Sequence, residues 1–187
     1  MTMNPLKSDE KLEPFIREHG DIELEPSEDP FERLVVSIVN QQLSTESAKA
    51  IKERLFDAVD VTPGAVLEAD EDTLRQTGLS RQKVDYLKSA AERFIEDDLS
   101  REKFSGMTDE QVIEELTSIH GVGVWTAKMF LIFVLAREDV FPVEDLGIRR
   151  AMTRVYGIED RKDMVDKAEE WRPYRSVASL YLWRSVD

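Results

Sequence analysis

Apolar residues recur at helical spacing along almost the whole chain. In the segment Phe31–Ile38 they fall at positions i, i+3, i+4 and i+7, and the segment Val84–Phe94 has a similar apolar face. Asp29 and Ser80 stand shortly before these segments and belong to the residue types that cap helix N termini. No hairpin dipeptide flanked by alternating apolar residues occurs, so strands are not expected. The pattern predicts an all-α protein.

Capping residues mark further helix starts. We expect helices to begin after Ser44, Thr62, Asp70 and Thr108, and a helix over residues 146–156 to follow Asp145. Gly78 is a predicted helix stop. The chain contains no internal repeat, low-complexity tract or long linker. Its 187 residues therefore fit one domain or two small, closely packed lobes.

A glycine turn joins two of the expected helices. One helix extends through Leu116, the turn is Gly121-Val122-Gly123, and an apolar helix begins at Val124. Backbone N–H groups at a helix N terminus form an anion site, and glycine leaves room for a phosphate to approach the backbone. The carboxylate of Asp145 comes after the second helix. A phosphate-binding turn followed by a placed carboxylate indicates chemistry on a nucleic acid.

Five ordered segments carry a resemblance to a known family. They are residues 31–44 (FERL to VNQQLS), 74–80 (LRQTGLS), 119–127 (IHGVGVWTA), 140–145 (VFPVED) and 171–176 (WRPYRS). In these segments the chain resembles the helix-hairpin-helix superfamily of DNA glycosylases, and within it the alkylpurine branch of the 3-methyladenine DNA glycosylase II type. The resemblance covers the chain from about Asp29 to the C terminus. A lone Gly-x-Gly is a weak signal, whereas five segments in the family order are specific.

The family fold is helical and two-lobed, with the active site in the cleft between the lobes. The resemblance therefore implies a helical barrel lobe over residues 29–118. It implies a second lobe from residues 1–28 and 119–187, which carries the hairpin and the aspartate. The longer alkylpurine enzymes add an N-terminal α/β domain, which we expect this chain to lack.

The resemblance makes Asp145 the expected catalytic residue. Breaking a base–sugar bond builds positive charge on the sugar, and a carboxylate fixed beside the sugar stabilises that charge. Glu144 is adjacent and projects in a different direction, so a catalytic pair is not expected. A second interpretation is that Asp145 caps the following helix, and the two roles are compatible.

Trp125 in the hairpin also indicates which nucleophile the enzyme uses. In the bifunctional branches of the family, the position of Trp125 carries a lysine whose amine attacks the sugar. Tryptophan cannot form that Schiff base, and Lys128 does not fill the matched position. The resemblance therefore implies a monofunctional enzyme that uses water as nucleophile. Core packing is the alternative role for Trp125.

Several residues in or near these segments are expected to bind the flipped base or to fill the gap that it leaves in the DNA. Trp125, Trp183 and Met129 form the expected base pocket. Trp183 falls where the alkylpurine enzymes place a tryptophan that attracts a cationic purine, and Met129 replaces a family tyrosine. Gln42 and Leu79 are the expected wedge residues, which fill the gap left by a flipped base. The alternatives are a polar helix face for Gln42 and ordinary packing for Leu79.

The expected phosphate-binding residues are Gly121, Gly123, Val124, Thr126 and Arg149, with Arg150, Arg154, Arg172 and Arg175 as further candidates. Family hairpins often bind Na⁺ or K⁺ through backbone carbonyls, which here are those of Thr117, Ile119 and Val122. No other cofactor is expected. With two histidines and no cysteine, a zinc site is not expected and the four-cysteine iron–sulfur cluster of the endonuclease III branch is excluded.

The net charge of −14 and the pI near 4.7 complicate this interpretation, because phosphate contacts normally come from a basic face. The acidity lies mostly in the first 144 residues, since nine Lys and Arg accompany eight Asp and Glu in residues 145–187. Dense acidic surface also resembles that of salt-adapted proteomes. A halophilic archaeon is therefore one expected source, and an ordinary cytosol is the other.

The sequence thus predicts a monofunctional DNA glycosylase that flips out an alkylated purine and hydrolyses its N-glycosidic bond in base excision repair. The alternatives are a non-catalytic helix-hairpin-helix DNA-binding protein and a glycosylase for deaminated or oxidised purines. The expected partner is double-stranded DNA containing damaged bases, bound by a monomer. The chain opens on no signal-peptide pattern and has no apolar run of about eighteen residues. We therefore expect no membrane partner and a cytoplasmic, nucleoid-associated protein of a prokaryote.

Overall fold

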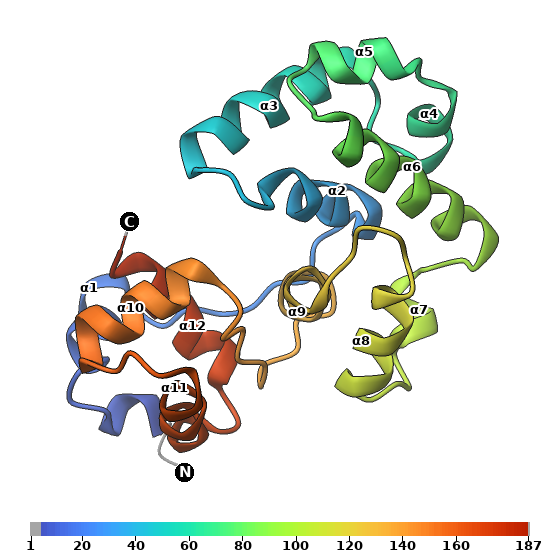
Figure 1. Cartoon of the computed structure of the whole chain (residues 1–187). Helices are drawn as coiled ribbons and strands as arrows, with labels where there is room; N and C mark the ends of the chain where they lie inside the picture. Colours follow the sequence, from blue (N-terminus) through green and yellow to red (C-terminus); the bar gives the residue numbers. More distant parts are fainter. Residues whose placement is uncertain (1–4, 187) are drawn as a thin grey trace. The chain divides into compact units, whose positions relative to one another are not determined.

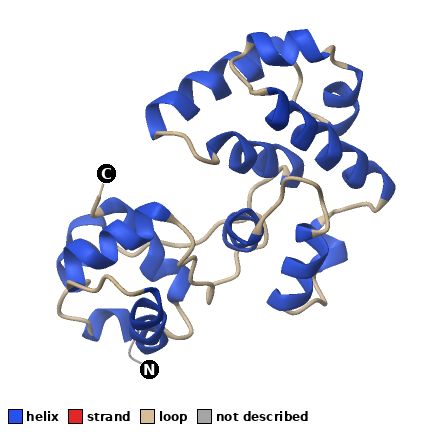
Figure 2. Cartoon of the chain, viewed as in Figure 1, coloured by secondary structure: helices blue, strands red, loops and turns tan. Residues whose placement is uncertain are grey.

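The computed structural model describes residues 5–186, and within that range every regular element is a helix (Figure 2). The elements are η1 (Pro5–Ser8), α1 (Glu13–His19), α2 (Pro30–Asn40), α3 (Thr45–Ala58), α4 (Pro63–Glu68), α5 (Glu71–Gln76), α6 (Arg81–Glu96), α7 (Arg101–Phe104), α8 (Asp109–Thr117), α9 (Val124–Phe133), α10 (Leu146–Tyr156), α11 (Arg161–Ala168), η2 (Glu169–Trp171) and α12 (Arg175–Arg184). The prediction of an all-α fold is confirmed.

The packing divides the chain into two compact units. The central unit is Ser27–Leu135, and the terminal unit combines Met1–Pro26 with Ala136–Asp187. The sequence analysis placed the boundary at residue 118 instead. The difference is the glycine hairpin and α9, whose apolar surface is buried on α2 and α8 of the central unit.

Helix α2 packs on α3, α6 and α9 within the central unit (Figure 1). It begins as predicted, because the side chain of Asp29 accepts a hydrogen bond from the Glu32 N–H at 2.9 Å. Its predicted apolar face is buried, and the ring of Phe31 meets that of Phe94 on α6 edge to face, with centroids 5.1 Å apart. Helical periodicity alone therefore located this core element.

Helix α9 is apolar on nearly all sides, and a helix of that composition must be enclosed. Its residues Met129, Phe130, Leu131 and Ile132 are buried, and α8 and α2 pack on it. Figure 1 shows α9 end-on, with α2 and α8 beside it. The N terminus of α9 is thereby fixed to the body of the central unit.

The terminal unit is built from both ends of the chain. Leu6 and Leu12 share one hydrophobic core with residues of α10, α11 and α12. The hydroxyl of Tyr181 on α12 donates to the Gly20 carbonyl at 2.7 Å and accepts from the Ile22 N–H at 3.1 Å. The N-terminal segment therefore holds the C-terminal helices in place.

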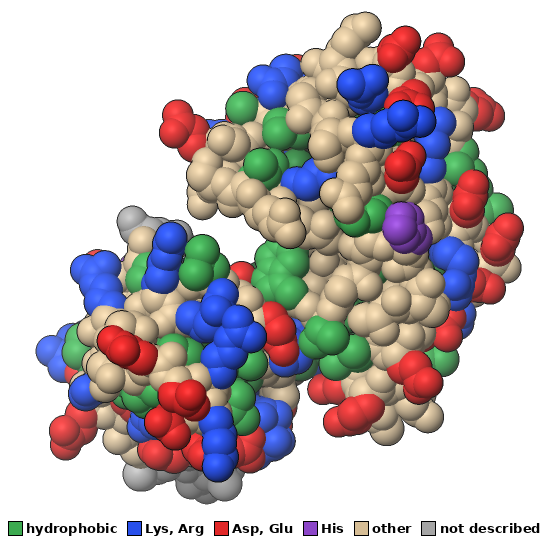
Figure 3. All heavy atoms as spheres, in the orientation of Figure 1, with side chains coloured by type: hydrophobic (Ala, Val, Ile, Leu, Met, Phe, Trp, Pro, Cys, Tyr) green, Lys and Arg blue, Asp and Glu red, His purple; other side chains and the backbone are tan. Residues whose placement is uncertain are grey.

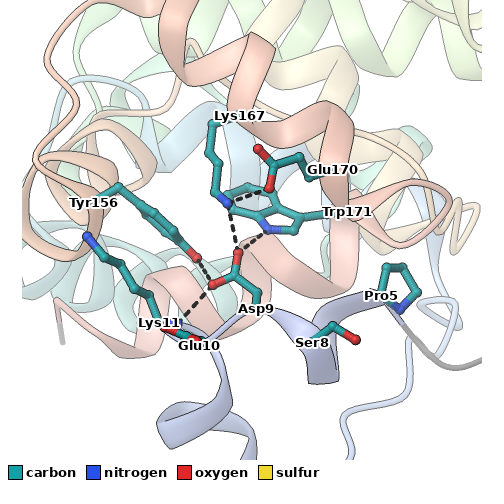
Figure 4. Close-up of a pocket in the computed structure, with 9 residues that line it drawn as sticks. All are labelled: Pro5, Ser8, Asp9, Glu10, Lys11, Tyr156, Lys167, Glu170 and Trp171. Atoms are coloured by element: carbon teal, nitrogen blue, oxygen red, sulfur yellow. Dashed lines mark hydrogen bonds and ion pairs between the residues drawn. The ribbon is translucent and has the colours of Figure 1, made fainter.

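A buried carboxylate strengthens this connection (Figure 4). The Asp9 side chain is 7% exposed and accepts hydrogen bonds from Trp171 Nε1 and the Tyr156 hydroxyl, both at 2.9 Å, and forms an ion pair with Lys167 Nζ at 3.1 Å. Burial alone would raise the pKa of Asp9. The hydrogen bonds from Trp171, Lys167 and Tyr156 together outweigh burial and hold that pKa below its usual value.

Replacing Asp9 with Asn should destabilise the protein by about 2 kcal/mol or more at pH 7, because the charged acceptor of a buried network is lost. The folded-state pKa of Asp9 lies below its unfolded value of about 3.9. Its contribution is therefore complete above the unfolded pKa and is lost as pH falls through the folded pKa. Urea unfolding of both proteins should show the difference shrinking below about pH 4.

Asp21→Asn is the matched control, since Asp21 pairs with Lys7 in the same N-terminal segment but its side chain is 72% exposed. It should leave the free energy of unfolding nearly unchanged. Equal stability of the Asp9→Asn protein and the parent at pH 7 would contradict the proposed role of the buried carboxylate.

Candidate active site

Asp145 is the N-cap of α10, which runs over the predicted residues 146–156. Its Oδ1 accepts a hydrogen bond from the Ile148 N–H at 2.8 Å. Gly157 ends the helix in the left-handed conformation. The capping role inferred from the sequence is thus confirmed, and it fixes the carboxylate at the positive end of a helix dipole.

The side chain of Trp183 on α12 reaches the same carboxylate. Its indole Nε1 donates to Asp145 Oδ1 at 2.8 Å, across 38 residues of sequence. The sequence analysis placed Trp183 in the base pocket and gave no hydrogen bond between these residues. Nothing in local spacing signals a contact of this kind, since it depends on how α10 and α12 pack.

The loop that leads to Asp145 is anchored on the C-terminal segment. Arg175 donates to Asp139 Oδ1 at 2.7 Å and to Glu169 Oε1 at 2.8 Å, and Arg172 pairs with the same two carboxylates. Ser176 accepts from the Val140 N–H at 2.9 Å. Arg172 and Arg175 were candidate phosphate ligands, but in the structure their charges are engaged by acidic neighbours and fix this loop.

Three further candidate arginines of the terminal unit lie on α10, and Arg150 is exposed. Arg154 Nη1 donates to the Ser185 carbonyl at 2.6 Å, so this side chain also joins α10 to the end of α12. Arg149 is half-buried, and its Nε is buried without a hydrogen-bond partner among the described residues. The Nε atom of Arg149 is therefore a buried donor that a bound group could satisfy.

The hairpin glycines serve different purposes. Gly121 has φ +88°, and a Cβ atom there would lie 2.0 Å from Cγ of Tyr86, so its glycine is required by backbone conformation and by packing. Gly123 is extended, caps α9, and has open space where a Cβ would be. The sequence argument that glycine keeps the backbone accessible fits Gly123. At Gly121 the left-handed backbone and the Tyr86 ring, which a Cβ atom would meet, are the reasons for glycine.

A glutamine that the sequence analysis left without a role joins the hairpin to the loop after α2. Gln41 Nε2 donates to the Gly121 carbonyl at 2.9 Å and to Thr126 Oγ1 at 3.0 Å. Lys83 Nζ donates to the carbonyls of Val39 and Gln41 at 2.6 and 2.8 Å, and burial lowers the pKa of this lysine. The network fixes the loop next to Gln42.

The other predicted residues of the central unit fall into exposed and buried groups. Gln42 is exposed with φ +56°, at the tip of its loop, and Val124 is 43% exposed at the start of α9. Trp125 is half-buried. Leu79 and Met129 are each 4% exposed, so both are packed in the interior. For Leu79, ordinary packing fits this placement, because a wedge must protrude.

The carbonyls considered for a monovalent cation lie in the turn between α8 and α9. The Ile119 carbonyl accepts from the Val122 N–H at 3.0 Å, so part of its acceptor capacity is used within the turn. Across residues 5–186, no group of three or more His, Asp and Glu side chains is placed to hold a metal ion. In the same range, no helix combines the length and apolar composition needed to cross a membrane.

Charges of both signs lie on the face of the protein drawn in Figure 3. On the face drawn in Figure 3, Lys and Arg side chains are interspersed with Asp and Glu on both units. A mixed surface of this kind offers a phosphate backbone few uncompensated cations. No continuous basic field is visible on this face.

Comparison with known proteins places this geometry in a family. A profile of the HhH-GPD superfamily base excision DNA repair proteins matches residues 35–173. DNA-3-methyladenine glycosylase 1 of Schizosaccharomyces pombe is 36% identical over 166 residues, covering 84% of this chain and 72% of that protein. DNA-3-methyladenine glycosylase of Saccharomyces cerevisiae is 36% identical over 200 residues, covering 84% of this chain and 67% of that protein.

A solved structure extends the similarity to three dimensions. The structure of Schizosaccharomyces pombe 3-methyladenine DNA glycosylase in complex with abasic DNA matches with a TM-score of 0.87 and 31% identity. The match covers 96% of this chain and 93% of that one. The chain therefore belongs to the HhH-GPD superfamily of base excision DNA repair proteins.

Proposed function

We propose that this protein is a monofunctional DNA glycosylase that removes alkylated purines from double-stranded DNA in base excision repair. The observation that carries the proposal is Asp145, a carboxylate fixed at a helix N terminus by two N–H donors, in a chain of this family. The protein acts as a monomer on damaged duplexes of the nucleoid of a prokaryotic cell.

One carboxylate is enough for the proposed reaction. An N-alkylated purine is already cationic, so it leaves with the electron pair of the C1′–N bond and becomes neutral without further protonation. The sugar gains oxocarbenium character, which the Asp145 carboxylate stabilises. Water then forms the C1′–O bond and gives its proton to the carboxylate and on to solvent. No cofactor takes part in these reaction steps.

The hairpin and the α2–α3 loop supply the grip on DNA. Gly123 leaves the N terminus of α9 without a capping side chain, so its first-turn amides suit a backbone phosphate. The backbone of Val124 and Thr126 belongs to this turn, and Arg149 is the proposed cationic contact. Gln42 is the proposed wedge, because it is exposed on a loop that Lys83 and Gln41 hold rigid.

Two other functions were considered. A non-catalytic DNA-binding protein would need residue 145 only as the N-cap of α10, a role that asparagine fills as well as aspartate. A glycosylase for deaminated or oxidised purines would act on a neutral base, whose departure is harder without protonation. Release of methylated purines but not of hypoxanthine from duplex DNA would distinguish the proposed substrate class from that second function.

Asp145→Asn should abolish excision and leave binding to lesion-containing DNA nearly intact. Asn keeps the cap and the acceptor for both N–H donors, so the change removes charge and not structure. The single-turnover rate on methylated duplex DNA should fall roughly 100-fold or more. A near-normal rate would remove Asp145 from the mechanism.

The reaction should end at an intact strand that bears an abasic site. Strand breaks should appear only after treatment with alkali, and borohydride should trap no covalent protein–DNA adduct, because Trp125 cannot form a Schiff base. A gel of end-labelled duplex, run beside a lyase-active glycosylase as positive control, measures both. A trapped adduct would show that another amine, such as that of Lys128, serves as nucleophile.

The affinity for DNA should depend only weakly on salt. Three of the five candidate arginines of the terminal unit are engaged by neighbouring groups, so few counterions are released on binding. The slope of log K against log salt should correspond to about two to four phosphates. A slope equivalent to about eight contacts, measured by fluorescence anisotropy, would show that cationic side chains dominate the grip.

A further inference from the structure

We propose that Trp183 is a positioning residue that acts through Asp145, and that its indole N–H sets the excision rate by fixing the direction of the catalytic carboxylate. The inference rests on the proposed function and deepens it. The resemblance alone suggests a stacking role on the cationic base. The contacts around residue 145 point instead to the polar edge of the ring.

Two donors converge on one carboxylate oxygen. Trp183 Nε1 and the Ile148 N–H each lie 2.8 Å from Asp145 Oδ1. A single donor leaves a carboxylate free to rotate about its Cβ–Cγ bond. Two donors from different directions fix both the rotamer and the plane of the group, and hydrogen bonds to an ionised acceptor are the stronger kind. The direction of the charge is thereby set before substrate arrives.

The backbone of α10 is shaped to admit this indole. A Cβ atom on Gly147 would lie 3.0 Å from Asp145 Oδ1, 3.1 Å from Trp183 Cδ1 and 3.3 Å from Trp183 Nε1. Gly147 lies inside a regular helix, where alanine is the better helix former. The glycine is therefore explained by the space that the carboxylate and the indole occupy together.

The helix that carries Trp183 is itself held on α10. Helices α10 and α12 pack together, and Trp183 packs against the core of the terminal unit. Arg154 on α10 also donates to the Ser185 carbonyl just beyond α12. The hydrogen bond from Trp183 to Asp145 therefore joins helices that also pack together and are linked by Arg154, and this support makes the indole a rigid donor.

Two substitutions separate positioning from stacking. Trp183→Phe keeps an aromatic face and removes the donor. Trp183→His keeps little of the face but can place an N–H at the ring position of Nε1, and at pH 8 it is neutral. Positioning predicts that the Phe variant is slowed roughly 10- to 100-fold and that the His variant is faster than the Phe variant. Stacking predicts the reverse order.

The measurement is single-turnover release of methylated purines from duplex DNA treated with dimethyl sulfate, with enzyme in excess, together with the dissociation constant for the same DNA. The dissociation constants should agree with the parent within about threefold, because the loss is in the chemical step. A Phe variant at the parental rate, or a His variant slower than the Phe variant, would overturn the inference.

Trp171→Phe is the matched control. Trp171 also donates its indole N–H to an aspartate of the terminal unit, Asp9, at 2.9 Å. Its loss should lower the melting temperature and leave the excision rate of the folded protein unchanged. An equal rate loss in both Trp→Phe variants would show that any weakening of the terminal unit slows excision, and the specific role of Trp183 would fail.

Gly147→Ala tests the same geometry while Asp145 and Trp183 both keep their native side chains. It should slow excision while the melting temperature stays equal or rises. Gly64→Ala is its control, because Gly64 also occupies the second position of a helix but has nothing within 4 Å of the added Cβ. Gly147→Ala at the parental rate would count against the inference. Full activity of Asp145→Asn would refute the proposed function, whereas an inactive Asp145→Asn with a fully active Trp183→Phe would refute this inference alone.

Discussion

The proposed chemistry depends on one constraint: the carboxylate of Asp145 must keep one direction at the start of α10. The amide of Ile148 and the indole of Trp183 satisfy it by donating to the same oxygen of Asp145. Both donors are neutral N–H groups, one from the backbone of α10 and one from a side chain of α12. The links from Arg154, Tyr181 and the Asp9 network then hold the helices that carry these donors.

The two glycines of the hairpin are needed for different reasons, and the Gly-Val-Gly pattern alone does not show which reason applies to which glycine. At Gly121 the backbone is left-handed and covered by Tyr86, so its glycine is needed for packing. At Gly123 the space is open, so its glycine leaves the helix terminus uncovered. Gln41 then ties the carbonyl of the first glycine to the α2–α3 loop. The proposed phosphate site and the proposed wedge loop therefore share one support in the structure.

Helix caps and helix boundaries could be predicted, because they depend on short stretches of sequence. The caps at Asp29, Thr108 and Asp145 and the span of α10 follow from residue types a few positions apart, and the structure has them where expected. Contacts between distant segments could not. Nothing in the sequence around Arg175 indicates that its partners are acidic side chains instead of phosphates. A lysine on a helix face, such as Lys83, is usually solvated. Both reach partners chosen by tertiary packing.

The same argument explains how an acidic chain can suit DNA. Net charge determines the electrostatic potential far from the protein, whereas a bound phosphate forms hydrogen bonds with individual donors at short range. Acidic groups pair with Arg172 and Arg175, and these ion pairs hold the loop that ends at Asp145. The cost in long-range attraction is offset by a better-fixed carboxylate. The ion pairs of Arg172 and Arg175 therefore stabilise the fold near Asp145, and in the proposed function the contact with DNA phosphates falls chiefly to amides at the N terminus of α9.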